Sequence, residues 1–401
     1  MKDFQYGAPT ELVFGAGAST KLAKEIVRLG GSRAVIVSDR GIAGAGLVDR
    51  LAAVFDGQTA VSLVGTWTEV PQDPTFTDVA KLVEMLRAER ADTVVSLGSG
   101  SVLAAGRSAG VCAPSSKSVR EVAKGGTSEA PLLNIAVPTT AGSGGEVSRQ
   151  ATLTDDETGE KSGVRGWNVA ARLAVLDPQL LTSVPRSQAV ASGIDAMTHA
   201  LEAYWSKRAT VLTDALARPA FKVLVEKLPL SLGSSDTEVL GDMLVASAMA
   251  NLACGNAGLG LVHGLNKGIT GVAHKKGYEA VSYGMLHGVL LPWVIDFNRP
   301  AAAQKLADLA SDLDQYRGRE FSAASGAAAL LETLVQWLAD LGATSQLPWT
   351  SCDNDDLDFI AKDTAGRAMW QDNPRTATEE ELKELTRLAL TDWKQRDWSA
   401  S

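Results

Sequence analysis

The stretch Ala191-Ser-Gly-Ile-Asp195-Ala-Met-Thr-His199-Ala-Leu-Glu-Ala-Tyr204 is the segment around which the rest of the chain is best understood. Its apolar side chains recur at helical spacing and alanine fills the gaps, so the sequence predicts a helix. Asp195 and His199 stand four residues apart, and their side chains therefore leave the same helix face. Two interpretations are open: the pair binds a divalent cation, or it forms an Asp–His hydrogen bond in a packed core.

The composition is that of a globular protein with more than one core. The chain has 401 residues, which predicts two domains, and its 45% hydrophobic and 21% charged content argues against disorder. A formal net charge of −9 argues against a nucleic-acid-binding surface. Cys112, Cys254 and Cys352 are scattered, without the spacing of a metal site or a disulfide framework, which suits a reducing compartment.

The first residues contain no apolar signal core, and no uncharged apolar run reaches membrane-spanning length. We therefore expect a soluble cytoplasmic protein with no membrane partner. The chain has only four histidines, at positions 199, 263, 274 and 287, so a metal site has few candidate ligands.

Residues 1–184 alternate short β-branched runs with helical stretches, a rhythm that predicts a mostly parallel sheet of the nucleotide-binding type. We expect strands at residues 33–38, 59–64, 93–97 and 133–137, and helices near residues 19–29 and 76–89. The sequence thus predicts an α/β dinucleotide-binding domain over residues 1–184.

Three segments follow predicted strands at the edge where open α/β sheets bind ligands. Asp39, in Val37-Ser38-Asp39-Arg40-Gly41, can accept hydrogen bonds from an adenosine ribose and favour NAD over NADP, or it can simply cap a helix. Gly98-Ser99-Gly100-Ser101 precedes a helix whose N-terminus can bind a pyrophosphate. Thr139-Thr140-Ala-Gly142-Ser143 can contact phosphates or a ribose, although solvated loops look similar. Two such loops after two strands favour a dinucleotide site.

From about residue 185 the strand signals stop, and we expect an all-helical domain over residues 185–401, with helices at 209–226, 237–252, 327–341 and 378–393. In this half, His263 and His287 each precede a glycine within apolar helical sequence. Either histidine alone is more often a packed or surface residue than a ligand. Together with Asp195 and His199 they would form an Asp/His₃ set, which favours Fe²⁺ or Zn²⁺ with an open position for substrate.

Several motifs occur in one order along nearly the whole chain. They are Leu12-Val-Phe14-Gly-Ala-Gly17, Val37-Ser-Asp39-Arg-Gly41, Pro138-Thr-Thr-Ala-Gly-Ser-Gly-Gly-Glu146-Val, Leu176-Asp-Pro-Gln-Leu180, the segment Gly193–Tyr204, Gly260-Leu-Val-His263-Gly and Asn373-Pro-Arg375. On these motifs the chain resembles the iron-containing (group III) alcohol dehydrogenases, relatives of glycerol dehydrogenase and dehydroquinate synthase. The resemblance implies an α/β dinucleotide domain, a helical domain, and a cleft between them that holds NAD(P) and a metal.

The resemblance also implies roles for individual residues. It makes Asp195, His199 and His263 metal ligands. It assigns cofactor contacts to Asp39 at the adenosine ribose, to Gly98, Ser99, Gly100 and Ser101 at the pyrophosphate, to Thr139, Thr140, Ser143 and Leu180, and to Lys161 near a cofactor ribose.

The chain departs from the family pattern at two kinds of position. The family's phosphate turn usually continues with an aspartate and a lysine, where this chain has Ala104 and Arg107, so a polar anchor is missing from that helix. Lys267 stands where the family often has a second histidine. Because a protonated lysine cannot bind a metal, we expect Lys267 to relay a proton or to hold an anionic group.

At the fourth metal ligand the chain also differs from the family pattern. Alignment on Leu290-Leu-Pro292 puts Tyr283 at the family's ligand position, and His287 follows one helical turn later with its own glycine. We expect His287 to be the ligand. If it is not, the site has three protein ligands or binds metal weakly, and Tyr283 donates a proton instead.

The resulting hypothesis is hydride transfer between NAD(H), preferred over NADP(H), and a small alcohol or aldehyde, with the metal as Lewis acid. Lys267 and Arg149 motivate a further hypothesis that the substrate carries an acidic group. Two alternatives remain: non-redox metal chemistry of the dehydroquinate synthase kind, or a diverged protein that has lost its metal. We expect a homo-oligomer, a dimer or larger.

Overall fold

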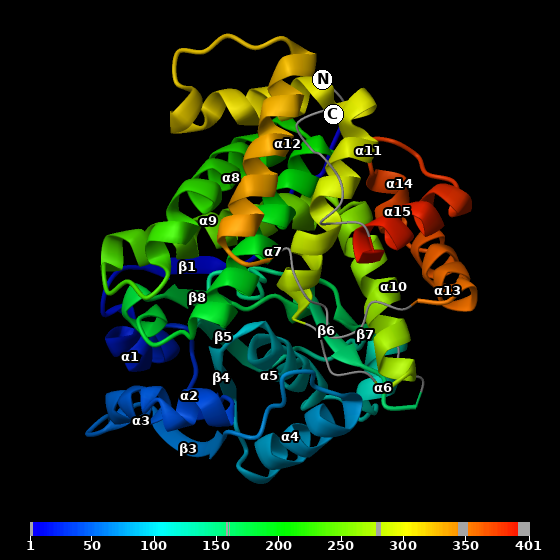
Figure 1. The fold of residues 1–401 in the computed structure, drawn as a ribbon. Helices are drawn as coiled ribbons and strands as arrows, with labels where there is room; N and C mark the ends of the chain where they lie inside the picture. The colour runs from blue at the N-terminus through cyan, green and yellow to red at the C-terminus, as the bar shows by residue number, and fades with distance from the viewer. Residues whose placement is uncertain (1–2, 158, 160, 278–281, 344–351, 392–401) are drawn as a thin grey trace. The chain divides into compact units, whose positions relative to one another are not determined.

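The computed structural model describes residues 3–157, 159, 161–277, 282–343 and 352–391, and its chain divides into two compact units (Figure 1). The sheet unit comprises residues 7–185 and 233–248. The helical unit comprises residues 1–6, 186–232 and 249–401. The predicted domain limits, 1–184 and 185–401, stay a hypothesis about which parts of the chain fold independently.

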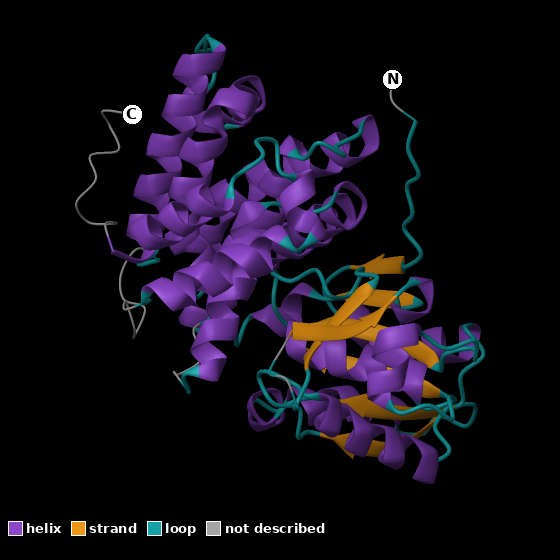
Figure 2. Ribbon diagram, turned by 90° about the vertical axis from the view of Figure 1, so that its right-hand side faces the viewer, coloured by secondary structure: helices purple, strands orange, loops and turns teal. Residues whose placement is uncertain are grey.

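The sheet unit is built on six parallel strands, drawn as orange arrows in Figure 2. In spatial order they are β1 (Glu11–Phe14), β8 (Leu173–Leu176), β5 (Leu133–Pro138), β4 (Thr93–Gly98), β2 (Arg33–Val37) and β3 (Ser62–Trp67). The central strands are continuous buried runs because helices cover both faces of a parallel sheet. The predicted α/β class with a mostly parallel sheet is confirmed.

One predicted strand is misplaced. We expected a strand at residues 59–64, but β3 begins at Ser62 and continues to Trp67. Gly57 has a φ of 72°, so the chain is still turning before residue 62. Pairing starts where the Ser62 amide donates to the Ser32 carbonyl at 2.8 Å. Because β3 is an edge strand with partly exposed side chains, its end carries no strong apolar signal.

Other strands were not predicted at all, because they are only four or five residues long. They are β1, β8 and an antiparallel hairpin of β6 (Gln150–Thr154) and β7 (Lys161–Arg165). The helices of this unit are α1 (Leu22–Arg28), α2 (Arg40–Gly44), α3 (Leu47–Ala52), α4 (Phe76–Ala88), α5 (Gly100–Cys112) and α6 (Val119–Gly125).

Helix α5 lies unusually close to the sheet. A Cβ at position 106 would be 2.0 Å from the Ser96 hydroxyl, and one at position 110 would be 2.4 Å from the Asn134 side-chain oxygen. A Cβ at either of these two positions would therefore force Ser96 or Asn134 to move, and glycine avoids this. This close contact fixes where the N-terminus of α5 meets the ends of the strands.

The helical unit contains nine helices in the described part of the chain. They are α7 (Arg186–Trp205), α8 (Val211–Ser231), the last part of α9 (Thr237–Ala257), α10 (Leu261–Lys275), α11 (Tyr283–Asp312), α12 (Ala323–Asp340), α13 (Asn354–Ala365), α14 (Ala368–Asp372) and α15 (Glu379–Thr391). The four predicted helices correspond to α8, α9, α12 and α15. Residues 392–393 of the last one lie outside the described residues.

Helices α7 and α11 touch through their backbones. A Cβ at position 284 would lie 1.8 Å from the carbonyl oxygen of Ala191, so Gly284 is required there. Ala191 lies one turn before Asp195, and Gly284 lies three residues before His287. The glycine contact therefore sets the register that places His287 beside Asp195.

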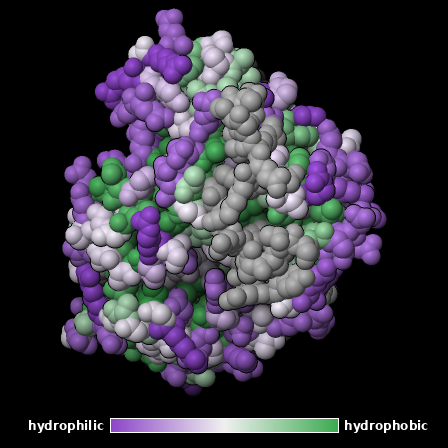
Figure 3. All heavy atoms as spheres, in the orientation of Figure 1, coloured by the Kyte–Doolittle hydropathy of each residue, from purple (hydrophilic) through white to green (hydrophobic). Residues whose placement is uncertain are grey.

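The face of the molecule in Figure 3 is mixed, with hydrophobic patches lying among hydrophilic side chains. Among the described residues no single helix is long and apolar enough to cross a membrane. Helices α9 and α10 meet that length and composition only when joined across a bend of 92°, and most of their apolar side chains are buried inside the protein.

The substitution Gly284→Ala tests the contact between α7 and α11. Because the new methyl group would overlap a backbone oxygen, we expect a loss of about 1–3 kcal/mol in stability, measured by chemical and thermal unfolding. Gly255→Ala is the matched control, since a Cβ on this α9 residue meets nothing within 4 Å. It should leave stability unchanged or raise it by up to about 1 kcal/mol. Equal stabilities of the two variants would contradict the close contact.

Candidate active site

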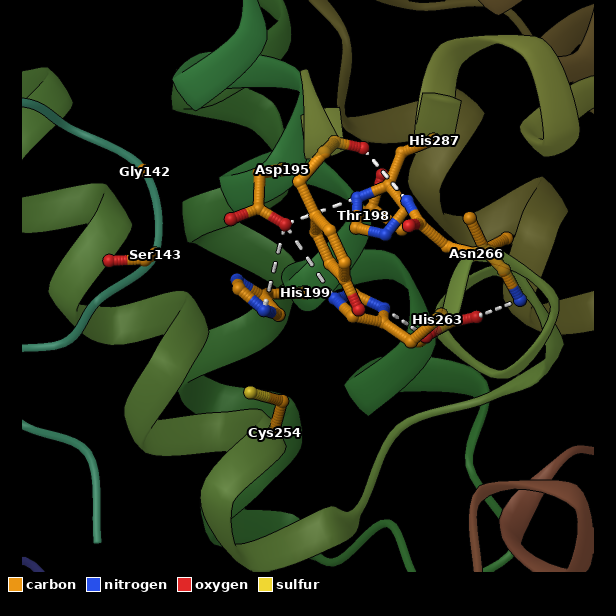
Figure 4. A network of polar contacts seen from close by, with 12 residues as sticks. Gly142, Ser143, Asp195, Thr198, His199, Cys254, His263, Asn266 and His287 are labelled. Carbon is orange, nitrogen blue, oxygen red and sulfur yellow. Dashed lines mark hydrogen bonds and ion pairs between the residues drawn. The ribbon is translucent and has the colours of Figure 1, made fainter. Parts of the chain in front are cut away.

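Four side chains from three helices of the helical unit converge on one point (Figure 4). Asp195 and His199 come from α7, His263 from the first turn of α10, and His287 from α11. Oδ1 of Asp195 lies 3.1 Å from Nδ1 of His287, 3.6 Å from Nε2 of His263 and 3.9 Å from Nε2 of His199. The predicted ligand set is thus gathered around one carboxylate oxygen.

The cluster leaves polar atoms buried without a hydrogen-bond partner. They are Oδ1 of Asp195, Nδ1 of His199, Nε2 of His263 and both ring nitrogens of His287. Buried polar atoms without partners are costly, so native proteins rarely keep them. Ligand atoms of Asp195, His199 and His263 all lie within 4.8 Å of one another. One carboxylate and three imidazoles form a donor set that suits Zn²⁺ or Fe²⁺.

The electrostatics of the cluster also fit a cation. Burial lowers the pKa of His199 to about 4, and burial together with His263 lowers the pKa of His287. The pKa of Asp195 is well below its usual range, because the neighbouring imidazoles outweigh the effect of burial. At neutral pH these groups are therefore two neutral imidazoles and a carboxylate, the protonation states that metal ligands require. His263 differs, because Glu202 and Asp195 outweigh burial and raise its pKa.

Glu202 is a site residue that the sequence analysis did not single out. It lies on α7 three residues after His199, fully buried, and its Oε2 atom is 2.7 Å from Nδ1 of His263. The signal was present, since Asp195, His199 and Glu202 share the i, i+4, i+7 face of one helix. Its partners on α10, however, lie about sixty residues further along the chain, where sequence spacing carries no information.

Tyr283 packs against the cluster, and Lys267 follows His263 in the sequence of α10. The Tyr283 ring packs edge-on against His287 with ring centroids 4.9 Å apart. Burial and the charge of Asp195 raise the pKa of Tyr283, so its phenol keeps its proton at neutral pH. Asn266 donates to the backbone carbonyl of Tyr283 at 2.8 Å, which ties the start of α11 to α10. Lys267 lies on α10 one turn after His263 and is partly exposed.

In the sheet unit, the two predicted loops at the strand ends meet. The Thr139 amide donates to the Gly98 carbonyl at 3.1 Å, where β4 and β5 end side by side. A Cβ at position 100 would lie 2.6 Å from the Ser143 hydroxyl. The glycine turn (residues 98–101) and the hydroxyl loop (residues 139–148) are therefore in contact. Ser99 precedes α5 without a side-chain hydrogen bond to its first turn. Amides in that position are suited to an anion such as a pyrophosphate.

The remaining predicted cofactor residues have structural partners of their own. Asp39 accepts a hydrogen bond from the Ile42 amide at 2.9 Å and caps α2, so its interpretation as a helix cap is confirmed. Lys161, at the start of β7, is paired with Asp73. Leu180 is buried just after β8. Contacts of Asp39, Lys161 and Leu180 with a cofactor stay predictions.

Arg107 anchors the hydroxyl loop from inside the sheet unit. Its guanidinium is fully buried and donates to the carbonyls of Ser148 at 2.6 Å, Gln150 at 2.8 Å and Leu103 at 3.0 Å. Glu146, buried nearby in the same loop, has its pKa raised to about 7 by burial. Arg107 therefore connects α5 to the loop through hydrogen bonds. Ala104 has no polar side chain and adds no such connection.

Comparison with known proteins decides the family. The family model described as "Iron-containing alcohol dehydrogenase" matches residues 9–178, and the one described as "Fe-containing alcohol dehydrogenase family, C-terminal" matches residues 189–390. The chain belongs to the iron-containing alcohol dehydrogenase family. This confirms the resemblance drawn from the sequence motifs. The protein is accordingly an oxidoreductase that acts on CH–OH groups.

Similar proteins cover the alcohol dehydrogenase almost end to end. The NAD-dependent methanol dehydrogenase of Bacillus methanolicus is 30% identical over 387 residues, covering 95% of this chain and 98% of that protein. The 1,3-propanediol dehydrogenase of Citrobacter freundii is 30% identical over 401 residues, covering 96% and 99%. The solved structure of a 1,3-propanediol oxidoreductase superposes with a TM-score of 0.89 at 28% identity, covering 97% of this chain and 100% of its own.

Glu146→Gln should change how stability depends on pH. The raised pKa means that native Glu146 stays protonated between about pH 4.5 and 7 while the unfolded carboxyl ionises. The stability that this carboxyl contributes is therefore lost as pH rises towards 7. The variant lacks that loss, so its stability relative to wild type should increase from pH 5 to pH 8 by on the order of 2–3 kcal/mol.

The measurement is denaturant unfolding of both proteins at pH 5 and pH 8. Glu84→Gln, at an exposed position of α4, is the control and should follow the wild type at both pH values. A stability difference between Glu146→Gln and wild type that does not change with pH would contradict the raised pKa.

Proposed function

We propose that the protein interconverts a small alcohol and its aldehyde with NAD(H), using one Fe²⁺ or Zn²⁺ ion held by Asp195, His199, His263 and His287. The observation that carries the proposal is the set of buried, unpartnered donor atoms converging on Asp195 in a member of this family. Similar proteins named for NAD-dependent methanol oxidation, propanediol oxidation and lactaldehyde reduction support the same reaction class.

In this mechanism the cation, when bound, acts as a Lewis acid on the substrate oxygen. Asp195 supplies the negative charge of the site, while the histidine nitrogens present lone pairs because burial keeps His199 and His287 neutral. We assign the phenol of Tyr283, protonated and next to His287, to hold or donate the proton that the substrate oxygen gains on reduction. Lys267 is a second candidate for relaying that proton.

For the cofactor, we propose that the first-turn amides of α5, with Gly98-Ser99-Gly100-Ser101, bind the pyrophosphate. Thr139, Thr140 and Ser143 lie beside this turn and would contact the nicotinamide half. Thr139 has a buried hydroxyl without a partner, which supports such a contact. We place Lys161 at a cofactor ribose and Leu180 against the cofactor. Asp39 favours NAD over NADP because its carboxylate would repel a 2′-phosphate.

Of the two cations behind the acidic-substrate hypothesis, Arg149 already has an aromatic partner. The guanidinium of Arg149 stacks over Trp167 at 4.8 Å from the ring centroid. Stacking on an aromatic ring gives Arg149 a structural role. A neutral small alcohol therefore explains the site with fewer assumptions, and the acidic group stays a secondary proposal.

We also propose a cytoplasmic homo-oligomer. All three cysteines are free thiols, as expected in a reducing compartment. The proposal of a dimer or larger assembly is tested by light scattering of the purified protein.

Single substitutions distinguish the two candidates for the fourth ligand. We expect His287→Ala to lower bound metal at least about tenfold and to abolish NADH oxidation with small aldehydes. Tyr283→Phe should keep the metal and lower turnover by about 10²-fold or more, as expected for a lost proton donor. His274→Ala, an exposed histidine of α10, is the matched control and should behave as wild type. Metal content is measured by elemental analysis. Metal lost from Tyr283→Phe but retained in His287→Ala would reverse the assignment.

Asp39→Asn tests the cofactor preference without removing the helix cap. Asparagine can still accept from the Ile42 amide, so thermal stability should stay within about 0.5 kcal/mol of wild type. Loss of the charge should raise kcat/KM for NADPH relative to NADH by about tenfold. Steady-state kinetics with both cofactors provide the measurement, and an unchanged ratio would show that Asp39 acts only as a cap.

A further inference from the structure

Glu202 is a buried carboxylate of the helical unit with three hydrogen-bonding contacts. Its side chain is fully buried on α7, and both oxygens are used. Oε1 accepts from the Val262 amide at 2.7 Å, and Oε2 accepts from the Gly260 amide at 2.8 Å and lies 2.7 Å from Nδ1 of His263. The same helix carries Asp195 and His199. Glu202 therefore connects the helix of two proposed ligands to the helix of a third.

The groups that face Glu202 belong to the first turn of α10, whose own N-cap makes no side-chain hydrogen bond. A carboxylate at a helix N-terminus is favourable, because the first amides point at it. Gly260 makes the approach feasible, since a Cβ there would lie 2.9 Å from Oε1 of Glu202. The start of α10 is thus shaped around this carboxylate.

This geometry determines which nitrogen of His263 carries hydrogen. Glu202 faces two backbone donors, so its oxygens act as acceptors, and Nδ1 of His263 must be the donor in the third contact. Nδ1–H leaves the lone pair of a neutral imidazole on Nε2. Nε2 is the atom that lies 3.6 Å from Oδ1 of Asp195 and has no hydrogen-bond partner of its own.

We propose that Glu202 is a positioning residue: it holds His263 as the Nδ1–H tautomer and fixes its ring so that Nε2 faces the cation shared with Asp195. This inference rests on the proposed metal site. A carboxylate that orients a histidine ligand typically changes metal affinity by about 10- to 100-fold. Removing the carboxylate should therefore weaken the metal site itself, beyond any loss of helix stability.

A purely structural role as a cap of α10 has to be separated from this one. Asn373 offers a matched control, because its Oδ1 atom accepts from the Leu261 amide at 3.4 Å in the same turn. Its amide also pairs in both directions with that of Asn298, and the two side chains are fully buried. No hydrogen bond joins Asn373 to His263 among those of the described residues. Asn373→Ala therefore perturbs the start of α10 without touching the histidine.

The first experiment compares metal binding in the full-length protein after chelation and reloading. Zn²⁺ affinity is measured by competition with a chromophoric chelator, and site geometry by the d–d absorption of the Co²⁺-loaded protein. Glu202→Gln should lose about 10- to 100-fold in Zn²⁺ affinity and change the Co²⁺ spectrum. Asn373→Ala should be destabilised but keep its affinity within about threefold and its Co²⁺ spectrum unchanged.

Equal losses of affinity in the two variants, in proportion to lost stability, would overturn the proposal in favour of a helix cap. A Glu202→Gln protein that binds Zn²⁺ like wild type would overturn it as well. Failure of wild type to bind Zn²⁺, Fe²⁺ or Co²⁺ would instead remove the proposed metal site, and with it the basis of this inference. The results thus distinguish failure of the inference alone from failure of the proposed function.

A second measurement needs no variant at position 202. The apoprotein labelled with ¹⁵N-histidine has only four imidazoles, and the signals of His263 are assigned by their loss in His263→Ala. The proposal predicts that His263, at a pH high enough for its ring to be neutral, is the Nδ1–H tautomer before any metal is added. An Nε2–H tautomer in the apoprotein would overturn the proposal even if Glu202→Gln failed to fold.

Discussion

Three imidazoles converge on one carboxylate oxygen of Asp195, and this convergence constrains how α7, α10 and α11 can pack. Four titratable side chains from α7, α10 and α11 share a space from which water is largely excluded, so their electrostatic cost is high without a compensating charge. Contacts between the surrounding helices offset this electrostatic cost. Gly284 lets α11 touch α7. Glu202 binds the start of α10 and Asn266 binds the start of α11, so contacts outside the cluster hold it in place.

In the sheet unit, packing holds the loops at the ends of the parallel strands in place. Glycines at positions 106 and 110 allow α5 to lie close to β4 and β5. The adjoining loops then meet through Thr139, Gly98 and Ser143. The buried guanidinium of Arg107 ties the far end of the hydroxyl loop to α5 through backbone carbonyls. Arg107, which stands where the family usually has a lysine, thus stabilises the conformation of this loop.

The sequence was informative where function or burial leaves a local pattern. Such patterns are the i, i+4 pair on α7, the glycines after His263 and His287, and the apolar runs of β2, β4 and β5, each of which is confined to a few consecutive residues. It was uninformative where partners are distant or elements are short. Strands β1 and β8 have four residues each, β3 was misplaced because an edge strand has no full apolar run, and the role of Glu202 depends on α10, far along the chain.

The contact between Tyr283 and His287 has a consequence for how such proteins are recognised and how they diverge. Two successive turns of α11 present neighbouring side chains, so on the proposed ligand set an evolving lineage can move a ligand from one turn to the next without rebuilding the helix. An intermediate with histidine at both turns would retain a complete site throughout. A search pattern that demands histidine in one fixed column would discard the descendants, although the space around Asp195 is still filled by imidazoles.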